Sequence, residues 1–227
     1  GNYYESYTPT TNGGAAAGLV ECGMSVSVPE EVLLLASQGA SAIPEGQREM
    51  ALRRQSLLAT HELGHVMGFG HNWASSINER ASVMDYPTPR VKVTQGRLDL
   101  SEAFDTSTGL YDAFMARYAY TELPQEKEAA GLNAIIAEMR AKNILYVPDT
   151  DPRWAWYDDR ATPDEYLRET MAARKIMLPQ YGPAILRPGE PIGGLRDLRL
   201  WMTYLHHRWA IEAGHRYIGG MYQNIVV

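Results

Sequence analysis

The sequence contains a single cysteine, Cys22, among its 227 residues, and this scarcity excludes two classes of architecture. One cysteine cannot form an internal disulfide, and it is too few for a zinc site built from thiolates. Long apolar runs are also missing, since no segment approaches the roughly 18–20 residues that a membrane-spanning helix requires. We therefore expect neither a disulfide scaffold nor a transmembrane segment.

The sequence also lacks a cluster of positively charged residues. The 21 basic residues form no dense group, and the formal net charge is -6. A chain of this kind has no electrostatic basis for binding nucleic acid or an anionic membrane, so we exclude both as partners. The first residues contain neither a methionine nor the basic and apolar regions of a signal peptide, which indicates a piece of a longer protein.

What the sequence does contain is mostly helical patterning. Alternating apolar residues predict one strand, over 19–28. Helical spacing and capping residues predict helices over 46–68, 108–120, 125–142, 164–177 and 195–213. Residues 71–97 read as irregular. The predicted fold class is α+β and predominantly α-helical, with a soft boundary near 122–126 that separates residues 1–122 from a helical C-terminal region, 123–227.

Three of the six histidines fall within the eleven residues HELGHVMGFGH, which run from His61 to His71. On a helix, residues four apart share one face, so His61 and His65 can present two imidazole nitrogens to one metal ion. Imidazole suits zinc, and a catalytic zinc site needs a third protein ligand with one position left open. Gly68 allows the helix to stop and the chain to turn back, so that His71 can supply that ligand.

Glu62 follows the first histidine and lies about 100° around the helix from it, so it need not bind the metal. Zinc lowers the pKa of a bound water molecule from about 15.7 to roughly 7. We expect Glu62 to take the proton from this water as the water attacks a peptide carbonyl, and to pass it to the leaving amine.

Other candidate ligands have simpler interpretations. Glu79 lies downstream of His61, and some zinc peptidases take their third ligand from a downstream glutamate on a second helix. The prolines that follow Glu79 argue against a helix there. We interpret the remaining histidines of the C-terminal half, His206, His207 and His215, as structural or solvent-facing.

Two further groups complete the inventory. The charges of Asp158, Asp159 and Arg160 are most simply a solvated turn. The side chain of Trp73 could equally well line a cleft or pack in the core.

The eleven-residue window resembles the zinc signature HExxHxxGxxH of the metzincin clan. The segment 82–87, SVMDYP, resembles the methionine turn of that clan, which implies that Met84 forms an apolar floor beneath the histidines. Tyr86 matches a position where astacin-like and serralysin-like members carry a tyrosine, so the resemblance implies that it ligates zinc at rest and stabilises the oxyanion. Taken alone, Met84 and Tyr86 would be read as core residues.

A closer resemblance is to a group of large bacterial zinc-dependent metallopeptidases that are often exported. It rests on the segments HNWASS (71–76), SVMDYP (82–87) and LDLS (98–101), and it is specific over 57–120. The resemblance implies a fragment with a metzincin-like catalytic core and an exported location, whether periplasmic, cell-surface or secreted. Metzincins place a mixed sheet before the zinc helix, and we expect most of that upper sheet to be truncated here.

The sequence thus predicts a zinc-dependent endopeptidase with Zn²⁺ as cofactor and a peptide or protein as substrate. The predicted zinc ligands are His61, His65 and His71, and the predicted catalytic residues are Glu62 and Tyr86. One alternative is a binding or scaffold domain that keeps zinc without turnover, although the intact Glu62 argues against it. Another is a zinc hydrolase of non-peptide amides, because the same ligands serve either chemistry.

Overall fold

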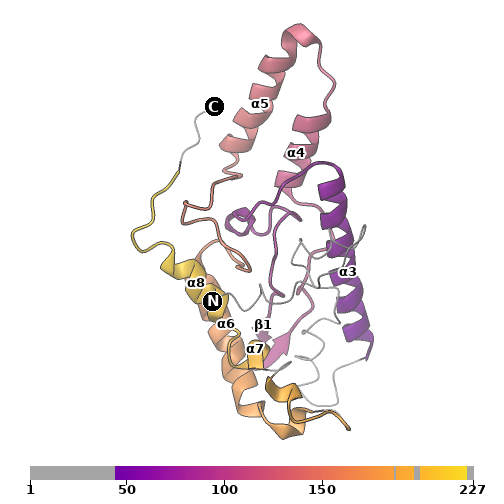
Figure 1. The fold of residues 1–227 in the computed structure, drawn as a ribbon, viewed down its shortest axis with the longest axis vertical. Helices are drawn as coiled ribbons and strands as arrows, with labels where there is room; N and C mark the ends of the chain where they lie inside the picture. Colours follow the sequence, from indigo (N-terminus) through magenta and orange to yellow (C-terminus); the bar gives the residue numbers. More distant parts are fainter. Residues whose placement is uncertain (1–43, 187, 197–199, 224–227) are drawn as a thin grey trace, which may run out of the picture.

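A computed structural model describes residues 44–186, 188–196 and 200–223 of the protein, so the strand predicted over 19–28 lies outside the described residues. Within those ranges about half of the residues are helical, and the one sheet has two strands (Figure 1). The predicted fold class, α+β and predominantly α-helical, is confirmed. None of the described helices combines the length and apolar character that crossing a membrane requires.

The helix that carries the first two histidines is α3 (Pro44–Val66), close to the predicted range. Proline suits its first position, because the amide hydrogen that proline lacks would have no partner within the helix there. The side chains of Leu57, Leu58 and His61 are buried, whereas Leu63 and Val66 are exposed. The helix therefore turns one face toward the core and carries His61, the first of the predicted metal ligands, on that face.

A short hairpin lies downstream of the three histidines, within and just after the range 71–97 that we expected to be irregular. Strand β1 (Lys92–Thr94) pairs antiparallel with β2 (Arg97–Asp99). Gln95 and Gly96, between the strands, both have positive φ angles, 52° and 77°. Such angles are typical of the tight two-residue turn that matches the twist of a hairpin. The expectation of an entirely irregular segment over 71–97 is therefore wrong.

Two helices then form an antiparallel pair, α4 (Leu110–Tyr120) and α5 (Glu128–Ala141), joined through the short 3₁₀ helix η2 (Gln125–Lys127) (Figure 1). Ile135 of α5 is buried in a cluster with Tyr111 and Phe114 of α4. The boundary predicted near 122–126 falls in the connection between the two helices, and the division into two regions stays a prediction.

The C-terminal part contains α6 (Pro163–Met177), which packs against β1 and against α8 (Arg208–His215). The prediction of a single helix over 195–213 is wrong, because the chain leaves the helical conformation between α7 (Leu200–Thr203) and α8. The carbonyl of Tyr204, in that interruption, accepts a hydrogen bond of 2.8 Å from Nε of Arg174 on α6. A tertiary contact thus replaces a hydrogen bond that a continuous helix would supply.

Most of the core lies between α3, the hairpin region and α6. Met84 and Phe104 are almost fully buried there, together with Ala173 and Met177 of α6. Short 3₁₀ helices over Ser75–Asn78 (η1), Leu178–Gln180 (η3) and Pro183–Ile185 (η4) complete the described elements. The segment 61–71, which carries the three histidines, therefore rests on a core to which the helix α6 contributes.

Candidate metal centre

The end of α3 turns the chain toward the third histidine. Gly68 has a φ of 85°, its amide donates to the His65 carbonyl at 2.9 Å, and the Phe69 amide donates to the Gly64 carbonyl at 3.0 Å. These two bonds and the left-handed glycine form a Schellman motif, which closes a helix and reverses the chain. Phe69 is buried and anchors the turn. The sequence expectation for Gly68 agrees with this geometry.

The three histidines converge at one point. Nε2 of His65 lies 3.0 Å from Nε2 of His61 and 3.1 Å from Nε2 of His71. Among the described residues, these three form the one group of potential ligands close enough to hold a single metal ion. Tetrahedral zinc with bonds of 2.0–2.1 Å would place its nitrogen ligands about 3.3 Å apart. The observed spacing is therefore close to what zinc requires.

The remaining ring nitrogens fix the tautomers of the first two ligands. Nδ1 of His61 donates to the carbonyl of Val83 at 2.6 Å, and Nδ1 of His65 donates to the carbonyl of Phe69 at 2.9 Å. A carbonyl can only accept, so the proton of each neutral ring lies on Nδ1 and the Nε2 lone pair points to the shared centre. Two lone pairs at this distance repel unless a cation lies between them, so the donor set fits a metal ion.

The environment also favours the neutral form of two of the rings, those of His61 and His71. Burial lowers the pKa of His61, and burial together with its histidine neighbours lowers the pKa of His71 to about 4. Metal binding requires the neutral imidazole, so a lowered pKa reduces competition from protons at neutral pH.

Met84 lies against the inner face of α3. Its side chain is fully buried, and a Cβ atom on Gly64 would collide with its sulfur. The absence of a side chain at Gly64, between the first two histidines, therefore lets the methionine pack directly beneath the helix. Its role as the floor of the site remains a prediction, and this position is compatible with it.

Asp112, at the start of α4, holds the segment around Met84 in place, and sequence reasoning assigned it no role. Its carboxylate accepts hydrogen bonds from the Ser82 hydroxyl at 2.6 Å, the Val83 amide at 2.9 Å and the Gly109 amide at 2.7 Å. Val83 in turn accepts the bond from His61. In the sequence, Asp112 lies near the start of the helix predicted over 108–120, a position that does not indicate these three hydrogen bonds.

Tyr86 reaches the same centre from the other side. Its hydroxyl lies 3.1 Å from Nε2 of His71, and its amide donates to Asp85 at 2.7 Å. Trp73 stacks on the His71 ring with centroids 4.4 Å apart and meets the Tyr86 ring edge-on at 4.5 Å. The tyrosine is thus close enough to the metal-binding point to contact a ligand held there.

The side chain of Glu62 is partly buried, and its Oε1 atom is buried without a hydrogen-bond partner among the described residues. A buried carboxylate oxygen without a partner is costly, and such groups are found where a ligand or water is to be bound. This observation agrees with the role expected of Glu62.

Asn72, directly after the third histidine, was not predicted to matter. It is 1% exposed, its amide donates to the Met84 carbonyl at 2.9 Å, and its side chain donates to the Leu145 carbonyl at 3.0 Å. It therefore ties the metal-binding turn both to the Met84 segment and to the chain that follows α5. Nothing in the local sequence pattern indicates a partner 73 residues away.

The charges at 158–160 are not the solvated turn that the sequence suggested. Asp159 is 2% exposed and accepts two hydrogen bonds from Arg80, at 3.1 and 2.9 Å, and two from Arg90, at 2.8 and 2.7 Å. Asp158 accepts from the Ser76 hydroxyl at 2.8 Å, and Arg160 pairs with Glu169 at 2.7 Å. That expectation is wrong, because two guanidinium groups offset the cost of burying the Asp159 carboxylate.

The other candidate ligands lie elsewhere. The side chain of Glu79 is 58% exposed and pairs with Arg90 and Arg160. His206 is 6% exposed, and burial lowers its pKa to about 4, as suits a neutral core residue. His207 is partly buried and His215 is exposed. None of the four belongs to a group of ligands among the described residues.

Comparison with known proteins supports the same assignment. Residues 44–227 match a family model described as Met-zincin. Neither the curated proteins nor the solved structures gave a match. The matched range covers most of the chain and includes the three histidines, Glu62 and Met84. The chain therefore belongs to the Met-zincin family, which places it among the zinc metallopeptidases of the metzincin clan.

Proposed function

We propose that this protein is an endopeptidase in which His61, His65 and His71 hold a zinc ion and Glu62 is the general base. The observation that carries the proposal is the convergence of three Nε2 atoms, two of which belong to rings, those of His61 and His65, that are oriented by hydrogen bonds to backbone carbonyls. This orientation is what distinguishes a prepared metal site from three histidines that merely lie close together.

The chemistry divides between the ion and the chain. A bound zinc ion supplies a Lewis acid that polarises the substrate carbonyl and acidifies water. Glu62 accepts the proton of the attacking water on its unpartnered buried oxygen and returns it to the leaving amine. The Tyr86 hydroxyl, next to His71, donates a hydrogen bond to the oxygen on which negative charge develops.

The surrounding residues contribute by keeping these groups in position. Val83 and Phe69 fix two imidazole rings, while Asp112 fixes Val83. Met84, buried against Gly64, provides an apolar support beneath the histidines. Small displacements of catalytic groups cost large factors in rate, so these contacts are part of the catalytic design.

The test compares the zinc-loaded chain with its Glu62→Gln variant on fluorogenic peptides and on acyl-amide substrates. Loss of the general base should lower kcat by about 10²–10⁴-fold while zinc content is unchanged. Glu126→Gln, a change of the same type at an exposed position on η2, should leave hydrolysis unaltered.

The same assay separates the alternatives. Turnover of acyl amides without turnover of peptides would show an amide hydrolase. Zinc binding without any turnover would show a binding domain. Unchanged peptide hydrolysis in Glu62→Gln would refute the assignment of the base.

A further inference from the structure

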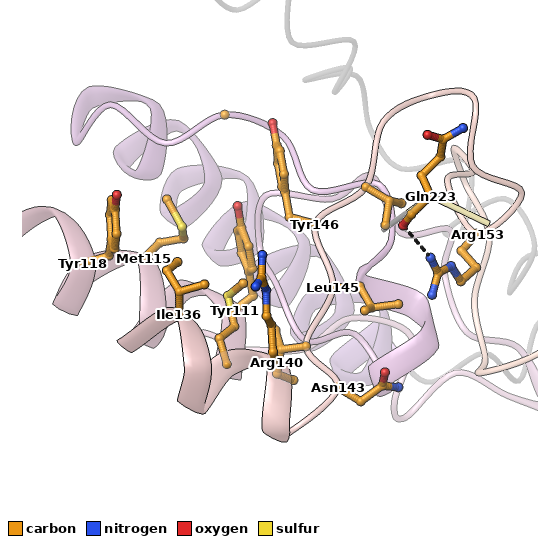
Figure 2. A pocket seen from close by; sticks show the side chains of 14 residues that line it. Tyr111, Met115, Tyr118, Ile136, Arg140, Asn143, Leu145, Tyr146, Arg153 and Gln223 are labelled. Atoms are coloured by element: carbon orange, nitrogen blue, oxygen red, sulfur yellow. Dashed lines mark hydrogen bonds between the residues drawn. The ribbon is translucent and has the colours of Figure 1, made fainter. Parts of the chain in front are cut away.

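A groove of about 730 Å³ opens beside the metal-binding turn (Figure 2). Its lining includes Gly70, the residue directly before His71, and otherwise comes mainly from α4, α5 and the chain just after α5. A Cβ atom built on Gly70 would find only the Tyr146 hydroxyl nearby, at 4.0 Å, so this edge of the groove is open. The groove thus borders, at Gly70, the turn that carries His71, the third proposed zinc ligand.

The lining is suited to a large apolar group. Figure 2 shows Tyr111, Met115 and Ile136 along the helical side, with Tyr146 projecting beside them. The rings of Tyr111 and Tyr146 are nearly parallel, with an interplanar angle of 7° and centroids 6.0 Å apart. Methionine adapts its shape to what it contacts, and the volume lies within the roughly 300–1,000 Å³ of typical ligand sites.

The groove is held rigidly to the metal-binding turn. The Asn72 side chain donates to the Leu145 carbonyl at 3.0 Å, and the Tyr120 hydroxyl donates to the Met67 carbonyl at 2.7 Å. These bonds attach both sides of the groove to residues that flank the third ligand. At its other end, Arg153 donates to the Gln223 carbonyl at 3.3 Å (Figure 2). The distance from groove to metal point is therefore set by the fold.

We propose that this groove is a specificity subsite that binds an aromatic or long aliphatic side chain of the peptide substrate. The inference rests on the proposed peptidase function. An extended peptide advances about 3.3–3.6 Å per residue, so a side chain within a few residues of the scissile bond can enter the groove from the Gly70 edge. The α4–α5 pair would then set substrate preference in addition to supporting the metal site.

The test uses peptides that differ only in the size of one side chain. A positional library of acetylated hexapeptide amides carries either phenylalanine or alanine at each position in turn. Binding is measured by calorimetry to the zinc-loaded Glu62→Gln chain, which separates recognition from turnover. At one position near the cleaved bond, the peptide with phenylalanine should bind at least about tenfold more tightly than the peptide with alanine, because the larger side chain buries more apolar surface.

The groove is then altered from α5. Ile136→Trp, which fills the groove, should lower the affinity for the phenylalanine peptide at least about tenfold and leave the alanine peptide unchanged. Ala137→Trp places the same side chain at an exposed neighbour that does not line the groove, and should change neither affinity. Ile136→Ala, which enlarges the groove without overpacking, should shift the preference from phenylalanine toward tryptophan.

The outcomes separate the subsite from the catalytic claim. Equal binding of both peptides at every position, or equal effects of Ile136→Trp and Ala137→Trp, would overturn the subsite even if the parent chain cleaves peptides. Binding that depends on Ile136, in a parent chain that cleaves no peptide, would support the subsite and overturn the peptidase function instead.

Discussion

The three converging histidines and Asp159 all depend on close partners, but those partners lie at very different distances along the chain. The three histidines fall within eleven residues and are brought together by one helix and one glycine. Asp159 is held by Arg80 and Arg90, which lie 79 and 69 residues away. The first arrangement follows from local geometry, whereas the second depends on the completed fold.

The strongest test of this difference is Asp159→Asn. Removing the charge leaves two buried guanidinium groups without their counter-ion, which we expect to lower the free energy of unfolding by about 4 kcal/mol. Urea denaturation gives the value. Asp164→Asn is the matched control, since its pair with Arg168 is largely exposed and should contribute less than about 1 kcal/mol. Equal effects of the two variants would show that the buried network does not support the fold.

Asp112→Ala tests hydrogen bonds that hold the segment next to the proposed metal site. Three donors lose their shared acceptor, so stability should fall by about 3 kcal/mol. Because Val83 orients His61, zinc affinity should also fall, by about 10–100-fold. Competition with a chelator measures the affinity, and Asp105→Ala, at an exposed position, serves as control. Unchanged zinc affinity would mean that Asp112 supports the fold alone.

Gly109→Ala sharpens the comparison at the start of α4. A Cβ atom there would overlap the backbone of Ala81, which cannot move aside as a flexible side chain can. We expect the free energy of unfolding, measured by thermal denaturation, to fall by about 2 kcal/mol. The contrast is Gly182→Ala, where a Cβ atom would meet nothing and the backbone is extended. A similar Tm for both variants would refute the steric explanation.

The last prediction concerns acid. Burial opposes ionisation of Asp159, but hydrogen bonds and charges from Arg90 and Arg80 dominate and lower its pKa from 3.8 to about 2. The stabilisation is therefore complete above pH about 4 and is lost as the pH falls from about 4 toward 2, with a size of about 2 kcal/mol. Unfolding measured across this range should show that loss in the parent chain and not in Asp159→Asn. The same pH dependence of stability in the parent chain and in Asp159→Asn would contradict this role of the Asp159 carboxylate.

Local signals account for what the sequence could predict. Good helix formers, capping residues and helical periodicity together located α3, α4, α5 and α6 within a few residues. The convergence of His61, His65 and His71 could be predicted for a similar reason, since helix geometry and the Gly68 turn determine it. The sequence did not reveal the hairpin of β1 and β2, whose strands have only three residues each.

Contacts across the chain account for what the sequence could not predict. The break between α7 and α8 involves a hydrogen bond from Arg174, and the burial of Asp159 depends on Arg80 and Arg90. Asn72 has its partner at Leu145. In each case the pairing forms only when separate segments meet, so a periodic pattern carries no trace of it. Charged residues in a loop were read as solvated because that is the usual outcome without a counter-ion.

The most direct test of the account is the zinc content of the purified chain, measured by mass spectrometry after reconstitution. We predict about one zinc ion per parent chain, loss of that ion in His65→Ala, and its retention in His207→Ala, which alters a histidine outside the ligand group. No zinc in the parent chain, or full occupancy in His65→Ala, would contradict the metal site on which the proposed function depends.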